Sequence, residues 1–243
     1  MVKEKRIKLV AVSLSSQCIK KPKCSFCYNN GGGISAFDKW RVGEKIDDLS
    51  PQVVCLEYSG YNLGFLDLLR SRGHILTMTT MPQLVTTPFC KLIKANGVSA
   101  LSISYDSEKV KSVEEWVAVA MIAKNCQLKV GCNFLIEEVP FQVPKEILAT
   151  AHQLNLLVLK PYGKLDPYSL DYVKLEIERC KSFLPVAVDN CLGYQLDLIK
   201  QCKAGIDFVH INPDGSVQPC CFMDKCFLAL IASRCPANEQ EVV

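Results

Sequence analysis

Three cysteines near the start of the chain have a spacing that could hold a metal centre. Cys18, Cys24 and Cys27 form the pattern C-x5-C-x2-C directly after an apolar run at residues 7–14. A two-residue gap lets a turn aim two thiolates the same way, and Pro22 keeps the preceding loop extended. A closed structural zinc site takes four ligands, whereas an iron–sulfur cubane held by three cysteines leaves one iron open for a substrate or cofactor.

Two other readings of these cysteines are a structural zinc site with a distant fourth ligand and a set of reduced thiols without metal. The next cysteine after Cys27 is Cys55, and the three histidines, His74, His152 and His210, are scattered. No ligand is therefore close enough in sequence to complete a local zinc site. The spacing favours the open cluster over zinc.

The composition is that of a globular protein. With 243 residues, 49% apolar and 22% charged, the chain can form one large α/β domain or a domain with a small appendage. A net charge of +3 does not by itself indicate a nucleic-acid or anionic-membrane partner. No apolar run is long enough to span a membrane, and the N-terminus has no signal-peptide core, so we expect a cytoplasmic protein.

Fourteen cysteines are many for a reducing compartment, where they indicate metal binding rather than disulfides. Some are expected to have no role in a site. Cys55, Cys126 and Cys132 lie within or beside apolar runs, where free cysteine behaves as a small buried hydrophobe.

The hydrophobic pattern alternates between short β-branched runs and longer helical ones, which predicts βα units around a parallel sheet. Strands are expected at residues 7–14, 53–58, 75–80, 100–105, 128–136 and 156–160. Helices are expected at residues 36–41, 62–72, 85–95, 110–123 and 144–154. Such a sheet is either doubly wound or part of a (β/α) barrel. Both folds place their chemistry at the carboxyl ends of the strands, which is where Cys18 to Cys27 follow the first strand.

The pattern changes towards the C-terminus. A helix at residues 169–183, a strand at 184–188 and a helix at 192–201 precede a predicted hairpin at 208–220, which turns at residues 212–215. Six cysteines surround the hairpin: Cys191, Cys202, Cys220, Cys221, Cys226 and Cys235. Because the hairpin is too short to form an apolar core of its own, we predict a C-terminal appendage that is stabilised by a bound metal. We therefore divide the chain into a domain of residues 1–184 and an extension of residues 185–243.

With both cysteine groups in place, the chain resembles the radical S-adenosylmethionine superfamily. The segment Cys24-Ser-Phe26-Cys27 matches the end of that family's C-x3-C-x-aromatic-C pattern, although five residues rather than three separate Cys18 from Cys24. The resemblance implies a partial (β/α)6 TIM-like barrel and a [4Fe–4S] cluster whose open iron chelates S-adenosylmethionine. It also implies reductive cleavage of that cofactor to a 5′-deoxyadenosyl radical, with an electron donor such as flavodoxin or ferredoxin.

The resemblance also implies a set of cofactor contacts. Ser59-Gly60 aligns with the start of the family's Gly-Gly-Glu-Pro segment, and Tyr61-Asn62 stand where the second glycine and the acid belong. Gly60 would permit close approach to the methionine amine, and Asn62 would supply an oxygen acceptor unless it is only a helix N-cap. The cofactor-binding residues implied are Phe26, Ser59, Gly60, Asn62, Ser104 and Asn133.

The C-terminal cysteines resemble the SPASM or twitch extensions of the same superfamily. Cys202, Gly215 and Cys220 satisfy their opening pattern, which implies one auxiliary iron–sulfur cluster with Cys226 as its third ligand. The fourth ligand would be Cys191, Cys221 or Cys235. Such extensions most often accompany enzymes acting on peptides, so the expected substrate is a peptide or protein side chain.

Two alternatives to this reading stay open at the level of sequence. A small metabolite or cofactor precursor is the alternative substrate, and a structural zinc-binding module is the alternative of another class. Lys20, Lys21 and Lys23 form a basic patch, but lysines on a solvated loop are the default explanation, so no nucleic-acid partner is expected.

Overall fold

The structure is a computed structural model that describes residues 7–20, 24, 36–70, 72–158 and 167–220. Its centre is a nine-stranded sheet in the order β7-β6-β5-β4-β3-β2-β1-β8-β9. The strands are β1 (Leu9–Ser13), β2 (Val53–Tyr58), β3 (Ile75–Thr80), β4 (Val98–Tyr105), β5 (Lys129–Ile136), β6 (Gln153–Val158), β7 (Val186–Val188), β8 (Phe208–Ile211) and β9 (Val217–Gln218). All neighbours pair in parallel except β9, which is antiparallel to β8. The predicted α/β fold with a curved, barrel-like sheet and a C-terminal hairpin is confirmed.

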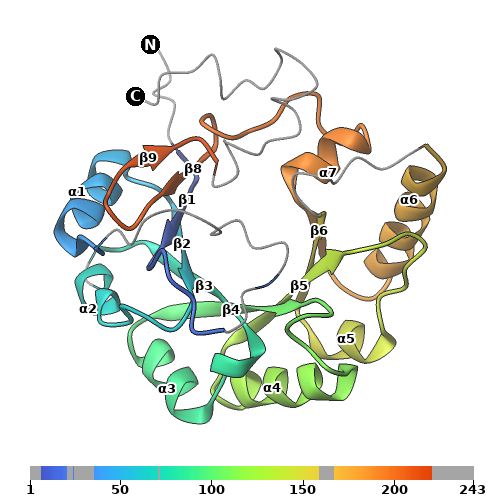
Figure 1. The fold of residues 1–243 in the computed structure, drawn as a ribbon, viewed down its shortest axis with the longest axis horizontal. Helices are drawn as coiled ribbons and strands as arrows, with labels where there is room; N and C mark the ends of the chain where they lie inside the picture. Colours follow the sequence, from blue (N-terminus) through green and yellow to red (C-terminus); the bar gives the residue numbers. More distant parts are fainter. Residues whose placement is uncertain (1–6, 21–23, 25–35, 71, 159–166, 221–243) are drawn as a thin grey trace.

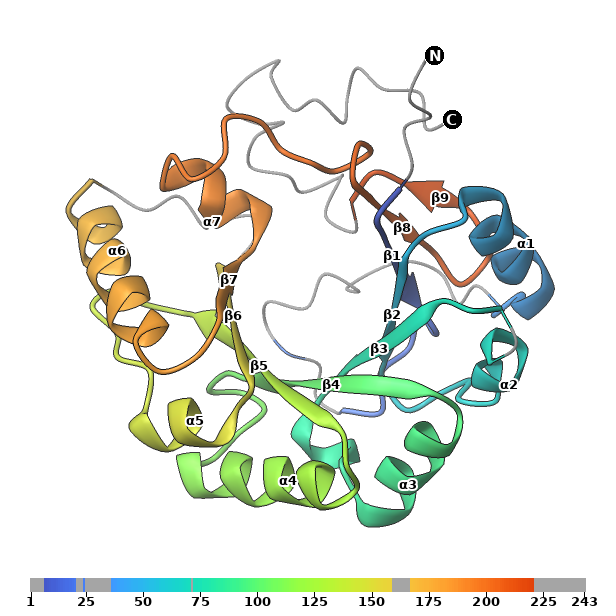
Figure 2. The same ribbon diagram turned by 180° about the vertical axis from the view of Figure 1, so that it is seen from behind.

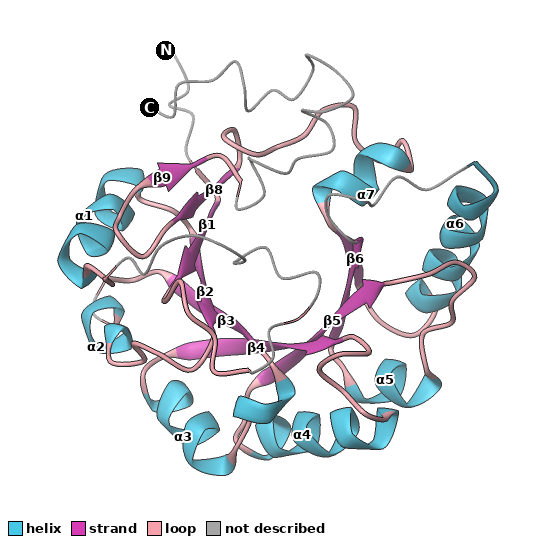
Figure 3. Ribbon diagram, viewed as in Figure 1, coloured by secondary structure: helices cyan, strands magenta, loops and turns pink. Residues whose placement is uncertain are grey.

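Helices cover the outer side of this curved sheet (Figures 1 and 2). They are α1 (Lys39–Leu49), α2 (Phe65–Leu69), α3 (Thr87–Ala95), α4 (Val113–Asn125), α5 (Lys145–Thr150), α6 (Pro167–Lys181) and α7 (Asn190–Gln195), with a 3-10 turn η1 (Pro82–Leu84). Every second strand residue points to the helices, as the fully buried Val10, Val12, Val54 and Leu56 show. The main core therefore lies between the sheet and the helices, and the other face of each strand lines the concave inner side (Figure 3).

Several elements differ from those predicted. Helix α1 has 11 residues instead of the short helix expected at 36–41, and its N-cap is Asp38, whose carboxylate accepts from the N–H groups of Trp40 and Arg41. Strand β6 begins three residues earlier than expected, because its polar positions face the inner side of the sheet. Helix α2 begins at Phe65 with Gly64 as its N-cap, so Asn62 is not the cap residue.

The C-terminal hairpin is joined to the main sheet. Strand β8 pairs in parallel with β1, with Leu9 opposite Phe208 and Val12 opposite Ile211. The hairpin turn uses Gly215 at φ +81°, where an added Cβ would lie 2.6 Å from Arg41 Cγ of α1. The boundary drawn between residues 184 and 185 stays a prediction, although strands from both sides of it belong to one sheet.

Candidate functional site

The inner face of the sheet is polar. Its side chains include Ser13, Cys55, Glu57, Thr77, Thr79, Ser102, Ser104, Asn133 and Asn155, which alternate with buried apolar residues. Asn155 donates to Asn133 Oδ1 over 2.7 Å, and Asn133 donates to Thr79 over 3.4 Å, two strands away. A plain (β/α)8 barrel fills this space with branched apolar side chains. The concave side of this sheet is instead suited to a polar ligand, and it includes the predicted contact residues Ser104 and Asn133.

The cysteines of the N-terminal motif follow β1 at the carboxyl end of the sheet. Cys18 is partly buried and Cys24 is buried, whereas Cys27 and the neighbouring Phe26 lie outside the described residues. Residues 14–20 follow β1 and contain Cys18, and we name them the approach segment. Its path places Cys18 at the end of the sheet where parallel α/β folds carry their active sites.

Hydrogen bonds join the approach segment to the loop between β2 and α2. The Ile19 N–H donates to the Ser59 carbonyl over 3.2 Å, and the Ser59 hydroxyl donates to the Gln17 carbonyl over 2.6 Å. The Asn62 amide donates to the Leu14 carbonyl, also over 2.6 Å. The predicted cofactor-binding residues Ser59 and Asn62 therefore contact the chain that leads to Cys18.

Gly60 completes this contact. Its φ of +108° is one that a residue with a side chain rarely adopts, and an added Cβ would overlap the Ile19 side chain. The sequence predicted that Gly60 permits a close approach. In the structure, the group that approaches is Ile19.

A second set of contacts surrounds Cys24. Lys20 of the approach segment lies 4.0 Å from Glu108, and Lys109 pairs with the buried Asp106 over 2.7 Å, both in the loop after β4. Burial raises the pKa of the Cys24 thiol above its ordinary value, although the charges of Lys109 and Lys20 oppose that rise. A metal bound to this sulfur would instead favour the thiolate.

The described residues fit a bound group at this position. The Ser16 hydroxyl is buried and has no hydrogen-bond partner within the described part of the chain, and it lies two residues before Cys18. Buried hydroxyls usually have a partner. Because Cys27 lies outside the described residues, only two of the three predicted thiols can be placed, and the described residues contain no group of three metal-ligating side chains.

One polar cluster on the inner face was missed by the sequence analysis. Ser13 donates to Glu57 Oε2 over 2.5 Å, and His210 Nε2 lies 3.0 Å from Ser13 Oγ and 3.3 Å from Glu57 Oε2. Gln218 is 3.2 Å from His210 Nδ1. Ser13 and Glu57 therefore both lie at Nε2 of His210, and Gln218 lies at Nδ1. A hydrolase triad requires a carboxylate at Nδ1, so these residues do not form one. Strand alternation could have placed Ser13 and Glu57 on the inner face, but only the pairing of β8 with β1 brings in His210.

The C-terminal cysteines lie partly within the described residues. Cys202 is buried and precedes β8, whereas Cys220 is partly buried and follows β9. Because β9 returns antiparallel to β8, Cys220 follows β9 at the end of the hairpin where the chain from Cys202 enters β8. Cys191 is in α7, and Cys221, Cys226 and Cys235 lie outside the described residues.

Comparisons with known proteins show the fold. No family model matches the chain, and no curated protein matches it. Among solved structures, Streptococcus suis SuiB bound to S-adenosylmethionine has a TM-score of 0.66 at 15% identity, over 90% of this chain and 60% of that one. The chain thus spans about three fifths of the length of SuiB.

A second similar structure is a barrel enzyme subunit. A mutant tryptophan synthase α-subunit of Pyrococcus furiosus has a TM-score of 0.50 at 13% identity, over 86% of this chain and 87% of that one. At these identities, both structures show the architecture alone. Within the part of the chain that the structure describes, no helix is long and apolar enough to cross a membrane.

Proposed function

We propose that this chain is a radical S-adenosylmethionine enzyme. Cys18, Cys24 and Cys27 would hold a [4Fe–4S] cluster, which when bound supplies the electron that cleaves the cofactor to a 5′-deoxyadenosyl radical. The observation that carries the proposal is that Cys18 and Cys24, two of the three cysteines, lie beside the loops that follow β1, β2 and β4, at the end of a sheet with a polar inner face. The fold shared with a structure that contains S-adenosylmethionine supports the same class.

The chain's own residues have three tasks in this proposal. The approach segment holds Cys18, and Lys20 of this segment and Lys109 of the loop after β4 place positive charge near Cys24. Ser104 and Asn133 offer a hydroxyl and a carboxamide to the cofactor's ribose or carboxylate from neighbouring strands.

We propose a peptide or protein side chain as the substrate, with a small metabolite or cofactor precursor as the second candidate. An electron donor such as flavodoxin or ferredoxin would supply the reductant. A second iron–sulfur cluster would use Cys202, Cys220 and Cys226, with the fourth place taken by Cys191, Cys221 or Cys235.

Metal analysis after anaerobic reconstitution tests this proposal against a zinc-binding module. We expect iron and sulfide in the wild-type protein, and roughly four iron atoms left per chain when Cys18, Cys24 and Cys27 are all replaced by Ala. Replacing Cys202 and Cys220 as well should remove those. A colourless wild-type protein with stoichiometric zinc would instead identify the zinc module.

A further inference from the structure

The loop between β2 and α2 makes its described contacts with the approach segment. We propose, on the basis of the proposed function, that this loop positions the cluster motif: Ser59, Gly60 and Asn62 hold the approach segment and thereby fix Cys18. The resemblance had assigned the same loop to the cofactor's methionine amine. In this chain the polar atoms of the loop bind the backbone of the approach segment, and its glycine makes room for the Ile19 side chain.

Asn62 has the two properties that this role requires. Its φ of +61° lies in the left-handed region, which asparagine adopts more readily than most residues with a side chain. Its Nδ2 donates to the Leu14 carbonyl at the end of β1. A carboxylate at this position has no proton to donate to a carbonyl, so the glutamate of the family pattern could not make this contact.

Ile19 and Gly60 give an independent contact. Ile19 is the residue after Cys18, and its N–H and side chain both rest on the β2–α2 loop. The chain departs from the family pattern in the long gap after Cys18 and in the altered segment at Tyr61-Asn62. Both departures therefore lie next to the interface between the approach segment and the β2–α2 loop. Any movement of that loop would be transmitted to Cys18 through one peptide unit.

The isosteric replacement Asn62→Asp separates positioning from cofactor binding. Asp tolerates the same backbone conformation but loses the donor, so we expect the reduced cluster to change its electron paramagnetic resonance spectrum. Iron loss to a chelator should become about three- to tenfold faster, as expected for one lost hydrogen bond. Asn62→Gly should behave in the same way, which separates the lost donor from the added charge.

A cofactor ligand would respond differently. Asp at position 62 would restore the acid of the family pattern, so S-adenosylmethionine should bind at least as tightly while the spectrum and the iron-loss rate stay unchanged. The matched control is Asn96→Asp, because Asn96 Nδ2 also donates to a backbone carbonyl, that of Leu92 over 3.0 Å at the end of α3. This control should leave the iron-loss rate unchanged.

A double-mutant cycle tests the apolar contact. Gly60→Ala should accelerate iron loss in the wild-type background and do so less when Ile19→Ala has removed the overlapping side chain. The backbone strain at φ +108° is present in both backgrounds and cancels in the cycle. The unfolding temperature of the iron-free proteins shows whether any effect is global rather than local.

The outcomes keep the two proposals apart. A wild-type chain that binds no iron overturns the proposed function and this inference together. Iron bound by wild type, with Asn62→Asp unchanged in spectrum and iron retention and with additive effects in the cycle, overturns the positioning role alone.

Discussion

Burial in the core keeps the thiols of Cys90 and Cys180 protonated. Burial raises the pKa of Cys90 to about 12 and that of Cys180 to about 12, with further contributions from the nearby Cys126 and Glu176 respectively. Both side chains are fully buried in the core. At neutral pH these thiols stay protonated, and thiols react as thiolates.

We therefore expect native alkylation with iodoacetamide at pH 8 to leave Cys90 and Cys180 unmodified. The partly exposed Cys126 should be modified under the same conditions. Peptide mass spectrometry before and after unfolding in guanidinium measures the labelling of each site. Rapid labelling of Cys90 in the folded protein would contradict the burial on which its assignment as a structural residue depends.

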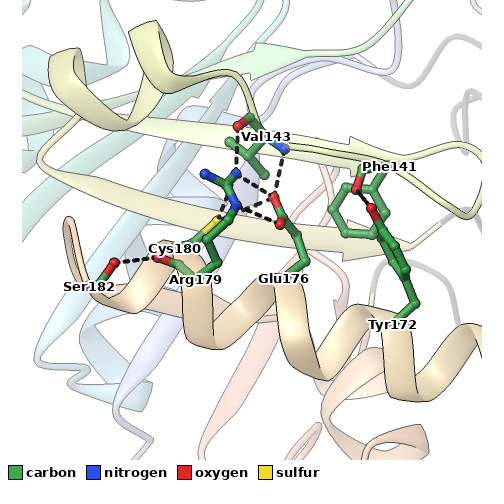
Figure 4. Close-up of polar contacts among 7 residues, drawn as sticks. All are labelled: Phe141, Val143, Tyr172, Glu176, Arg179, Cys180 and Ser182. Atoms are coloured by element: carbon green, nitrogen blue, oxygen red, sulfur yellow. Dashed lines mark hydrogen bonds and ion pairs between the residues drawn. The ribbon is translucent and has the colours of Figure 1, made fainter.

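At the scale of elements, an ion pair within α6, between Glu176 and Arg179, attaches the helix by hydrogen bonds to the segment before α5 (Figure 4). Glu176 accepts from the Val143 N–H over 2.7 Å and from Arg179 Nη2 over 2.6 Å. Arg179 also donates to the Val143 carbonyl over 2.7 Å, and the Tyr172 hydroxyl donates to the Phe141 carbonyl over the same distance. These bonds join the helix to the backbone of residues 141 and 143, so we assign them a structural role.

This network predicts a pH dependence of stability. Burial would raise the pKa of Glu176, but the hydrogen bonds from Arg179 and Val143 and the charge of Arg179 outweigh it and lower the pKa. A folded-state pKa below the unfolded value, about 4.3 for Glu, stabilises the protein above that value. The contribution is lost as the pH falls through the lowered pKa.

Glu176→Gln should therefore lower the free energy of unfolding at pH 7 by about 1.5 to 3 kcal/mol. The difference from wild type should shrink as the pH falls below about 4. Urea unfolding at several pH values measures it, with Glu178→Gln on the exposed side of the same helix as the control. A difference that stays constant down to pH 3 would show that the charge of Glu176 has no part in stability.

The elements with clear hydrophobic periodicity could be predicted from the sequence. Strands β2 and β3 have the predicted bounds, and β4 and β5 differ by at most two residues at either end. Helix α1 was underestimated because Gly43 interrupts its pattern, yet that glycine lets Leu68 and Arg72 of the α2 region pack close to it. Local sequence does not reveal a glycine that is required by a tertiary contact.

At the scale of the whole molecule, the sheet continues past the predicted boundary. Strand β8 covers the edge of β1, and β7 extends the other edge beyond β6. The pairing of segments 199 residues apart, as in the Lys8–Asp207 ion pair, leaves no signal in local periodicity. The Ser13–Glu57–His210 cluster depends on this long-range pairing of β8 with β1, so it could not be predicted from local sequence.

The covered edge predicts the behaviour of a shortened chain. Residues 1–184 alone would expose the unpaired backbone groups of β1 and the apolar surface that β8 buries with Val209 and Ile211. We expect this fragment to aggregate or to lack cooperative unfolding, whereas residues 1–220 should retain it. Circular dichroism and size-exclusion chromatography compare the two. A monomeric fragment of residues 1–184 that unfolds cooperatively would show that the first domain is independent of the hairpin.

The central claim is that the motif of Cys18, Cys24 and Cys27 forms the centre at which S-adenosylmethionine is cleaved. The most direct test is the formation of 5′-deoxyadenosine from S-adenosylmethionine by the anaerobically reconstituted protein with a strong reductant, measured by chromatography and mass spectrometry. We expect the wild-type chain to form it and each single Cys→Ala variant at these positions to lose that activity. Cleavage that persists when all three cysteines are replaced by Ala would contradict the claim.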